Sequence, residues 1–268
     1  MARRPPHPSL APFVRGYVGW FEHMAAPLCR RELPTDEVPV IISFGAPIRV
    51  YDAGDSQRSS IRDSFATGAY DSYVRVVSDG PSGGVQVNFS IFGARLFLNQ
   101  PLDALRNRSV ALDDVLGKLA ERLTTMLQEA PDWDARFAIL DREIAARLRA
   151  AVAPPAQVAW AWRRIIETSG QIGIGRLVGE IGWSQRHLIT RFRSDIGLSP
   201  KTMARVMRFA RAARQLRLAA RPELSTIALD CGYYDQSHFT RDFRAFAGVS
   251  PGELEASVLP DGGGIAAD

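Results

Sequence analysis

Two short segments carry glutamine, arginine and histidine side chains at matching positions, 51 residues apart. Residues 184–200 read SQRHLITRFRSDIGLSP, and residues 235–251 read DQSHFTRDFRAFAGVSP. Glutamine can pair through two hydrogen bonds with adenine, arginine can do so with guanine, and an exposed isoleucine can pack against a thymine methyl group. These residue types therefore suit the recognition of base edges in the major groove of DNA.

The histidines His187 and His238 occupy the same place in both segments, a pattern that could also serve catalysis or ligand binding. No cysteine or carboxylate repeats with them at a ligand spacing, so packing or backbone hydrogen bonding is favoured over chemistry. The sequence contains no GxSxG, glycine-rich phosphate loop, HExxH or paired-cysteine motif. We therefore predict no enzyme, no metal site and no cofactor.

Each segment follows an amphipathic stretch that predicts a short helix. The apolar residues fall at i, i+3, i+4 and i+7, and they are Ile174, Leu177, Val178 and Ile181 before the first segment, and Leu224, Ile227, Ala228 and Cys231 before the second. Gly182 and Gly232 can adopt the left-handed conformation that closes a helix. Ser184 and Asp235 can cap the helix that follows. The pattern predicts helix, tight turn and helix, made twice.

In the second helix of each pair, one face is apolar and the other is polar. Leu188 with Phe192, and Phe239 with Phe243, lie four residues apart and are expected to face inward. The outward residues are Gln185, Arg186, Ile189, Thr190 and Arg193 in the first copy, and Gln236, Ser237, Thr240, Arg241 and Arg244 in the second. Helix-turn-helix units place this helix in the major groove, so we predict that these residues contact DNA. A solvated helical domain with a basic exterior is the alternative, which two matching copies disfavour.

The stretch between the copies predicts one long helix. Ser199 and Pro200 supply an N-cap and a proline at the first helical position, and the chain then runs to Leu218 without glycine or proline. Roughly 18 residues at about 1.5 Å each give a rod of about 27 Å. Such a rod could hold two reading helices about one DNA turn apart, near ~34 Å. The cations of this stretch are Lys201, Arg205, Arg208, Arg211, Arg214, Arg217 and Arg221, and we predict phosphate contacts from Lys201 and Arg208.

From about Val158 to Ala256 the chain resembles the DNA-binding domain of AraC/XylS-type transcription regulators. The resemblance is carried by ALDCGYYDQSHFTRDFRAFAGVSPGEL, residues 228–254, and by GWSQRHLITRFRSDIGLSPKTM, residues 182–203. It implies seven helices that form two helix-turn-helix units joined by a linking helix, with base contacts from the exposed side of each reading helix. Ile189 and Thr190 depart from the longer polar residues often found there. The resemblance also implies double-stranded DNA and RNA polymerase as partners.

Charge is divided unevenly along the 268 residues. Residues 160–258 hold 15 Lys+Arg and 9 Asp+Glu, whereas the rest hold 18 and 20. The basic excess is therefore local, and the length of the chain favours two domains. Pro154 and Pro155 mark the expected boundary. We predict a sensor or dimerisation domain at 1–152, a linker at 153–157, a DNA-binding domain at 158–258 and a disordered tail at 259–268.

The first half predicts an α+β fold together with the helical second half. Residues 9–98 read as β structure, with VPVIISF at 38–44 and VQVNFSIF at 85–92, and residues 101–151 read as helical. The apolar residues of the helical part form two stripes, Leu116, Leu119, Leu123, Met126 and Leu127, then Phe137, Leu140, Ile144 and Leu148. We expect the first stripe in the core; the second suits either the core or a dimer interface.

This half resembles the small cupin-like β-barrel that many family members carry before a few helices. The resemblance implies binding of a small-molecule effector and often pairing of two subunits. The expected effector contacts are Trp20, Glu22, Arg31, Glu32 and Arg49. Cupin enzymes hold a metal with several histidines, whereas this half has only His7 and His23, which disfavours a metal site.

The chain has two cysteines, no apolar run long enough for a membrane span and no secretory signal, so we expect a cytoplasmic protein.

Three function classes remain. The leading interpretation is a sequence-specific transcription regulator controlled by a small effector. The alternative is an effector-independent regulator whose first domain is a dimerisation or protein-interaction module. An enzyme delivered to DNA, as in the related DNA-repair methyltransferases, would need a reactive metal-held cysteine that the sequence lacks.

Overall fold

The first half of the protein is built on two antiparallel sheets. The computed structural model describes residues 1–23, 27–51, 59–78, 80–218, 222–256 and 265–266. The six-stranded sheet has the order β1 (Ala2–Arg4), β2 (Val14–His23), β9 (Pro81–Ser90), β4 (Glu37–Ser43), β7 (Phe65–Thr67) and β10 (Ser109–Ala111). The five-stranded sheet has the order β11 (Ile265–Ala266), β3 (Leu28–Glu32), β8 (Val74–Ser78), β5 (Ile48–Tyr51) and β6 (Ser59–Arg62). The predicted barrel is therefore open, with its strands divided between two sheets.

The strands β4 and β9 separate two apolar layers, because alternate side chains of a strand point to opposite faces. Val40 of β4 and Val87 of β9 are buried in the main core together with the helices of the chain. Ile41 of β4 packs in a smaller cluster with Val50 of β5 and Phe65 of β7. The space between the two sheets is therefore a compartment of its own, apart from the main core.

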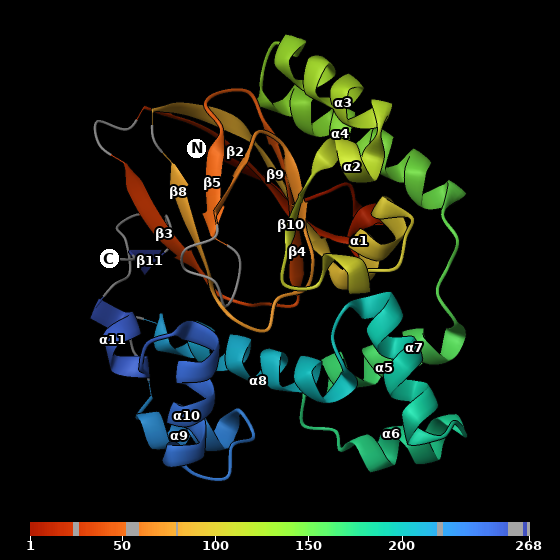
Figure 1. Ribbon diagram of the computed structural model, residues 1–268, viewed down its shortest axis with the longest axis vertical. Helices are drawn as coiled ribbons and strands as arrows, with labels where there is room; N and C mark the ends of the chain where they lie inside the picture. Colours follow the sequence, from red (N-terminus) through yellow and green to blue (C-terminus); the bar gives the residue numbers. More distant parts are fainter. Residues whose placement is uncertain (24–26, 52–58, 79, 219–221, 257–264, 267–268) are drawn as a thin grey trace.

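The part of the first half that the structure describes also contains four α-helices, which cover the outer face of the six-stranded sheet (Figure 1). They are α1 (Ile91–Leu98), α2 (Leu112–Leu116), α3 (Lys118–Glu129) and α4 (Trp133–Ala150), with short 3₁₀ turns η1 (Pro8–Leu10) and η2 (Asp103–Leu105). The prediction that Ile91 continues a strand was wrong. The Ser90 hydroxyl accepts a hydrogen bond from the Gly93 N–H, so Ser90 caps a helix and Ile91 begins it.

The two apolar stripes of the helical part both enter the core. Leu123 and Leu127 of α3 are fully buried, and so are Leu140 and Ile144 of α4. The second stripe, for which the sequence left two interpretations, thus packs inside the protein and forms no exposed seam.

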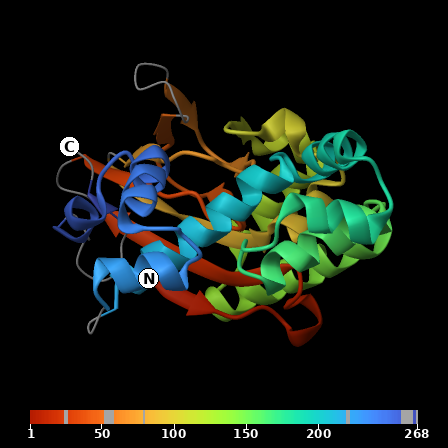
Figure 2. The same ribbon diagram turned by 90° about the horizontal axis from the view of Figure 1, so that it is seen from below.

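Within the described residues, the second half contains seven helices, the number that the family resemblance implies. They are α5 (Ala156–Glu167), α6 (Ile174–Ile181), α7 (Gln185–Ile196), α8 (Pro200–Leu216), α9 (Leu224–Asp230), α10 (Gln236–Ala247) and α11 (Pro251–Ala256). Figure 2 shows α8 running between the pair α6/α7 and the pair α9/α10. With 17 residues, α8 is about 25 Å long, and it begins at the Ser199 cap and Pro200 as predicted. Within the described residues, none of the helices combines the length and apolar character needed to cross a membrane.

The two halves share one continuous core and meet at several polar contacts. The Arg95 Nε on α1 lies 3.1 Å from the Asp195 Oδ1 on α7, and the two side chains are only 9% and 7% exposed. The Leu102 N–H donates to the Ser194 carbonyl at 3.0 Å. Near the carboxyl terminus of the chain, β11 pairs with β3 of the first half, which places Ile265 beside Arg31. Residues 265–266 of the expected disordered tail are thus part of a sheet, and residues 259–264 and 267–268 lie outside the described residues.

Candidate DNA interface and effector cavity

The two helix-turn-helix units have the local geometry that the sequence predicts. The Ser184 hydroxyl accepts a hydrogen bond from the His187 N–H at 3.2 Å, and the Asp235 carboxylate accepts one from the His238 N–H at 2.6 Å. Both residues are therefore N-caps of the reading helices α7 and α10. Gly182 and the later turn glycine at 232 adopt positive φ, 73° and 79°. This left-handed conformation favours glycine at the turn in both units.

The inward and outward faces of α7 and α10 are also those predicted. Leu188, Phe192, Phe239 and Phe243 are fully buried. The exposed members of the outward set are Gln185, Arg186, Thr190, Arg193, Gln236, Ser237, Arg241 and Arg244, while Ile189 and Thr240 are half-buried. The structure thus presents two polar helix faces to solvent, and their contact with DNA stays a prediction.

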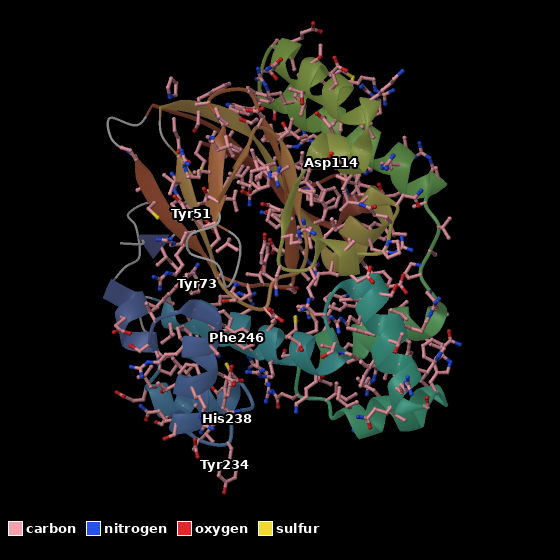
Figure 3. All side chains as sticks on the ribbon, viewed as in Figure 1. Tyr51, Tyr73, Asp114, Tyr234, His238 and Phe246 are labelled. Atoms are coloured by element: carbon pink, nitrogen blue, oxygen red, sulfur yellow. The ribbon has the colours of Figure 1, made fainter. Side chains whose placement is uncertain are left out.

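Both reading helices point their carboxyl ends at the first half of the protein. For α7 this follows from the contacts of Ser194 and Asp195 with the first half. For α10, Figure 3 shows Tyr234 and His238 at the end remote from the sheets and Phe246 at the end near them. The amino-terminal ends, which helix-turn-helix units insert into DNA, are therefore both free.

The cations of α8 divide into exposed and internally bonded side chains. Lys201 is exposed, as a phosphate contact requires. Arg208 is half-buried, since its Nη1 donates to the Gly232 carbonyl at 3.0 Å and its guanidinium lies 5.4 Å from the centre of the Tyr233 ring. Arg205 donates twice to the Asp242 carboxylate, at 3.2 and 2.8 Å, and this bond raises the pKa of the guanidinium. Arg205 and Arg208 therefore attach the linking helix to the second unit, and the geometry does not favour the phosphate contact predicted for Arg208.

The paired histidines make the same packing contact in both units. His187 meets the Trp183 ring edge-on, with centroids 4.5 Å apart and planes at 84°, and His238 meets Tyr233 in the same way, at 5.3 Å and 81°. These contacts fit the packing role favoured from the sequence. The signal for them is an aromatic residue directly after the turn glycine in each copy, which the sequence reasoning missed. Across the ranges that the structure describes, no group of three or more His, Cys, Asp or Glu side chains could hold a metal ion.

A cavity of about 490 Å³ lies between the two sheets of the first half. Four of the expected effector contacts, Trp20, Glu22, Arg31 and Glu32, are among its lining residues, whereas Arg49 is not. On β5 the neighbours Ile48 and Val50 line the cavity, so the alternation of the strand directs Arg49 to the opposite face.

Charged groups at the mouth of the cavity are partly compensated. The Arg30 Nη2 donates to the Glu22 Oε2 at 2.9 Å. Glu32 lines the cavity and is exposed to solvent there, and desolvation by the surrounding wall raises its pKa against the opposing effect of Arg30 and Arg217. Desolvation likewise lowers the pKa of Arg217, an exposed side chain directly after the end of α8. Sequence reasoning missed Arg30 and Arg217, and no local signal could identify Arg217, because the packing of the two halves brings it to the cavity.

One wall residue of the cavity also touches the second reading helix. The Arg31 Nη1 donates to the Ala247 carbonyl at the carboxyl end of α10, at 3.0 Å. Its guanidinium lies 4.7 Å from the centre of the Tyr73 ring. That ring in turn covers Gly248, where an added methyl group would collide with it. A cation at this helix end also interacts favourably with the helix dipole.

Two family models match the chain. A model described as a helix-turn-helix domain matches residues 177–257, and a model described as a domain of unknown function (DUF6597) matches residues 2–111. The HTH-type transcriptional regulator MtrA of Neisseria gonorrhoeae is 31% identical over 80 residues, which are 30% of this chain and 26% of that protein. The chain therefore aligns with about a quarter of the length of this curated relative.

Solved structures of ToxT from Vibrio cholerae share the fold over about nine tenths of the chain. The structure of ToxT from strain O395 has a TM-score of 0.50 at 11% identity, covering 90% of this chain and 97% of that one. A structure of ToxT bound to (E)-4-(8-methylnaphthalen-1-yl)but-3-enoic acid has a TM-score of 0.51 at 11% identity, covering 90% and 98%. The match of the helix-turn-helix model to residues 177–257 and the two-part fold shared with ToxT agree with the resemblance of the sequence to AraC/XylS-type regulators.

Proposed function

We propose that this protein is a sequence-specific DNA-binding transcription regulator whose α7 and α10 enter successive major-groove segments of one duplex. The observation that carries the proposal is the pair of exposed polar faces, with Gln185 and Arg186 on one helix matched by Gln236 and Arg241 on the other. Glutamine and arginine on the exposed face of a reading helix are the residues that pair with adenine and guanine. The proposal assigns no catalysis to the chain.

Binding-site selection with the full chain, followed by footprinting, tests this function. We expect a selected site with two protected segments about 10 base pairs apart, since the two helices would read adjacent turns. Arg186→Ala and Arg241→Ala should each relax the preference at a different base position. Equal losses of affinity on random and selected DNA for both variants would refute base reading by these residues.

We further propose that the cavity between the sheets binds a small-molecule effector that controls DNA binding. Its volume lies in the range of small-molecule sites, and its wall combines an apolar interior, including Trp20 and Phe65, with a few charged groups. Arg31 gives such a ligand a direct route to α10. A structure of ToxT, which shares this fold, holds a bound arylbutenoic acid, and this also supports the binding of a small molecule.

A thermal-shift screen of metabolites separates this proposal from the effector-independent alternative. A ligand that binds only the folded protein at about 100 times its Kd stabilises it by about 2.7 kcal/mol. Substituting Trp20→Ala in the cavity wall should abolish the shift, whereas Arg49→Ala on the outer face of β5 should keep it. If no ligand shifts Tm and the first half instead mediates concentration-dependent self-association, the interaction-module function is the better one.

The same proposal includes the domain division and partners expected from the sequence. We propose a sensor domain at 1–152, a linker at 153–157 and a DNA-binding domain at 158–258, acting in the cytoplasm with RNA polymerase. A homodimer is the further partner that the family likeness favours. Sedimentation of the full chain with and without a DNA fragment carrying one selected site would give the number of subunits bound per site.

A further inference from the structure

The turns of the two helix-turn-helix units differ in length by one residue. The first turn reads GWS at residues 182–184, and the second reads GYYD at residues 232–235. The turn glycines are therefore 50 residues apart, whereas the N-caps and all later matching positions are 51 apart. One residue of the second turn has no counterpart in the first.

The ring contacts identify which residue is the extra one. Trp183 packs edge-on against His187, and Tyr233 packs edge-on against His238. Tyr233 is buried and its ring lies 5.2 Å from that of Phe239. Because Tyr233 takes the place of Trp183 in the repeat, Tyr234 is the inserted residue.

Tyr234 contributes little to the folded core. Its side chain is 88% exposed, the highest value among the large apolar and aromatic side chains that the structure describes as exposed. A single exposed apolar residue on a surface is ordinary and by itself indicates nothing. What matters here is that an insertion in an otherwise repeated turn has placed this ring in solvent.

The position of Tyr234 is the start of the second reading helix. It precedes the N-cap Asp235, and Figure 3 shows it at the end of α10 that points away from the sheets. Gln236 and Ser237, two of the predicted base contacts, follow within one turn. When such a helix enters the major groove end-on, a side chain just before its first turn reaches the sugar–phosphate strand beside the groove.

We propose that Tyr234 is a DNA-backbone contact of the second unit, with its ring packed on a deoxyribose and its hydroxyl donating to a phosphate oxygen. This assignment rests on the proposed DNA-binding function. It also makes the two units unequal, because the shorter turn of the first unit provides no equivalent side chain. The contact positions the second unit on the duplex and carries no sequence information, as is general for contacts to sugar and phosphate.

Fluorescence anisotropy with the full chain and the selected DNA site tests the assignment. Tyr234→Ala should weaken binding about five- to tenfold, and Tyr234→Phe, which keeps the ring, about two- to threefold. Because the tyrosine is uncharged, the slope of log K against log salt should not change, unlike that of an arginine variant that loses a phosphate contact. The loss for Tyr234→Ala should be the same on sites with single base changes. Val152→Ala, which truncates a side chain that is 69% exposed in the connection before α5, should leave both Kd and Tm unchanged.

Several outcomes would overturn the assignment. Binding of Tyr234→Ala within twofold of the wild type would remove the contact altogether, and a loss confined to one base pair would replace backbone contact by base reading. A fall in Tm equal to that expected for a buried tyrosine would show that the ring packs within the protein. Failure of the wild-type chain to select any DNA would instead refute the proposed function, and this inference with it.

Discussion

Replacing Asp195 by asparagine should destabilise the protein far more than replacing any partner of an exposed ion pair. Asp195 on α7 and Arg95 on α1 form a nearly solvent-free pair between the two halves, and the Arg95 Nη1 is buried without a hydrogen-bond partner. Asp195→Asn keeps the shape of the side chain but leaves the arginine charge unpaired. Loss of one partner of a buried pair costs about 3 to 5 kcal/mol.

The expected effect on thermal unfolding follows from the size of the chain. At about 2 to 4 °C per kcal/mol for chains of this order of length, Tm should fall by about 6 to 20 °C. Arg122→Ala is the matched control, because Arg122 pairs with Glu143 at 2.9 Å but is 62% exposed. Exposed pairs contribute about 0 to 1 kcal/mol, so this variant should change Tm by no more than a few degrees.

A double variant distinguishes the two possible causes of a lower Tm in Asp195→Asn, which are the loss of the ion pair and the loss of side-chain packing. The double substitution Arg95→Met with Asp195→Leu removes both charges and fills the same space, and such replacements are often neutral or stabilising. Tm of the double variant should therefore return to within a few degrees of the wild type. The reasoning is refuted if Asp195→Asn lowers Tm no more than Arg122→Ala does.

Further predictions concern the arginines of α8, the cavity and DNA reading. Arg186→Ala and Arg241→Ala should each cost about 1 to 3 kcal/mol at one base position, measured by anisotropy on single-base variants of the selected site; uniform losses would contradict this. Arg208→Ala should lower both Tm and DNA affinity, because Arg208 bonds to the Gly232 carbonyl and packs on the Tyr233 ring. Lys201→Ala should instead reduce DNA affinity and the slope of log K against log salt, with Tm unchanged. An unchanged Tm for Arg208→Ala would restore its role as a phosphate contact. Burial and the charge of Asp36 raise the pKa of Glu37, so its carboxyl group binds a proton more tightly in the folded state than in the unfolded state. The resulting stabilisation is fully present below about pH 4.5, and it is lost as the pH rises through the raised pKa. Glu37→Gln should therefore flatten the pH dependence of urea unfolding between pH 4.5 and 7, and an identical profile for both proteins would exclude Glu37 as its source.

The second half could be predicted from the sequence because its signals are local. The glycine that closes α6, the caps Ser184 and Asp235, and the four-residue spacing of Leu188 and Phe192 each determine structure within one or two turns. A helix cap or a positive φ depends on few neighbours, so the residue type alone identifies it. The outward faces of α7 and α10 follow from the same periodicity.

The cavity and the bonds of the linking helix could not be predicted in the same way. Arg208 and Lys201 both read as cations of one helix, and only the packing of α8 on the second turn distinguishes them. Arg49 was misplaced because a shift of one residue along β5 reverses the side of the sheet. Arg217 reaches the cavity only because residues nearly two hundred positions apart are brought together. The periodicity of a sequence shows which side of a helix or strand is apolar, but it does not show which helices and strands pack against each other.

The attachments of the two reading helices indicate how an effector could change DNA binding under the proposed function. The carboxyl end of α7 is held by the buried pair of Arg95 and Asp195, and neither residue is among those that line the cavity. The carboxyl end of α10 is held by Arg31, which belongs to that lining. A ligand that engages Arg31 would therefore act on the second reading helix and leave the first in place. Both reading helices must fit one DNA duplex at a fixed spacing, so a small displacement of α10 alone would weaken the simultaneous binding of the two helices to DNA. A large change in DNA affinity would then require no movement of α7. In Arg31→Ala, the effector should therefore no longer change the affinity for DNA, although it still binds through the other residues of the cavity wall. Fluorescence anisotropy would measure DNA affinity, and thermal-shift titration would measure effector binding. Full retention of the effector response in this variant would refute the route through Arg31.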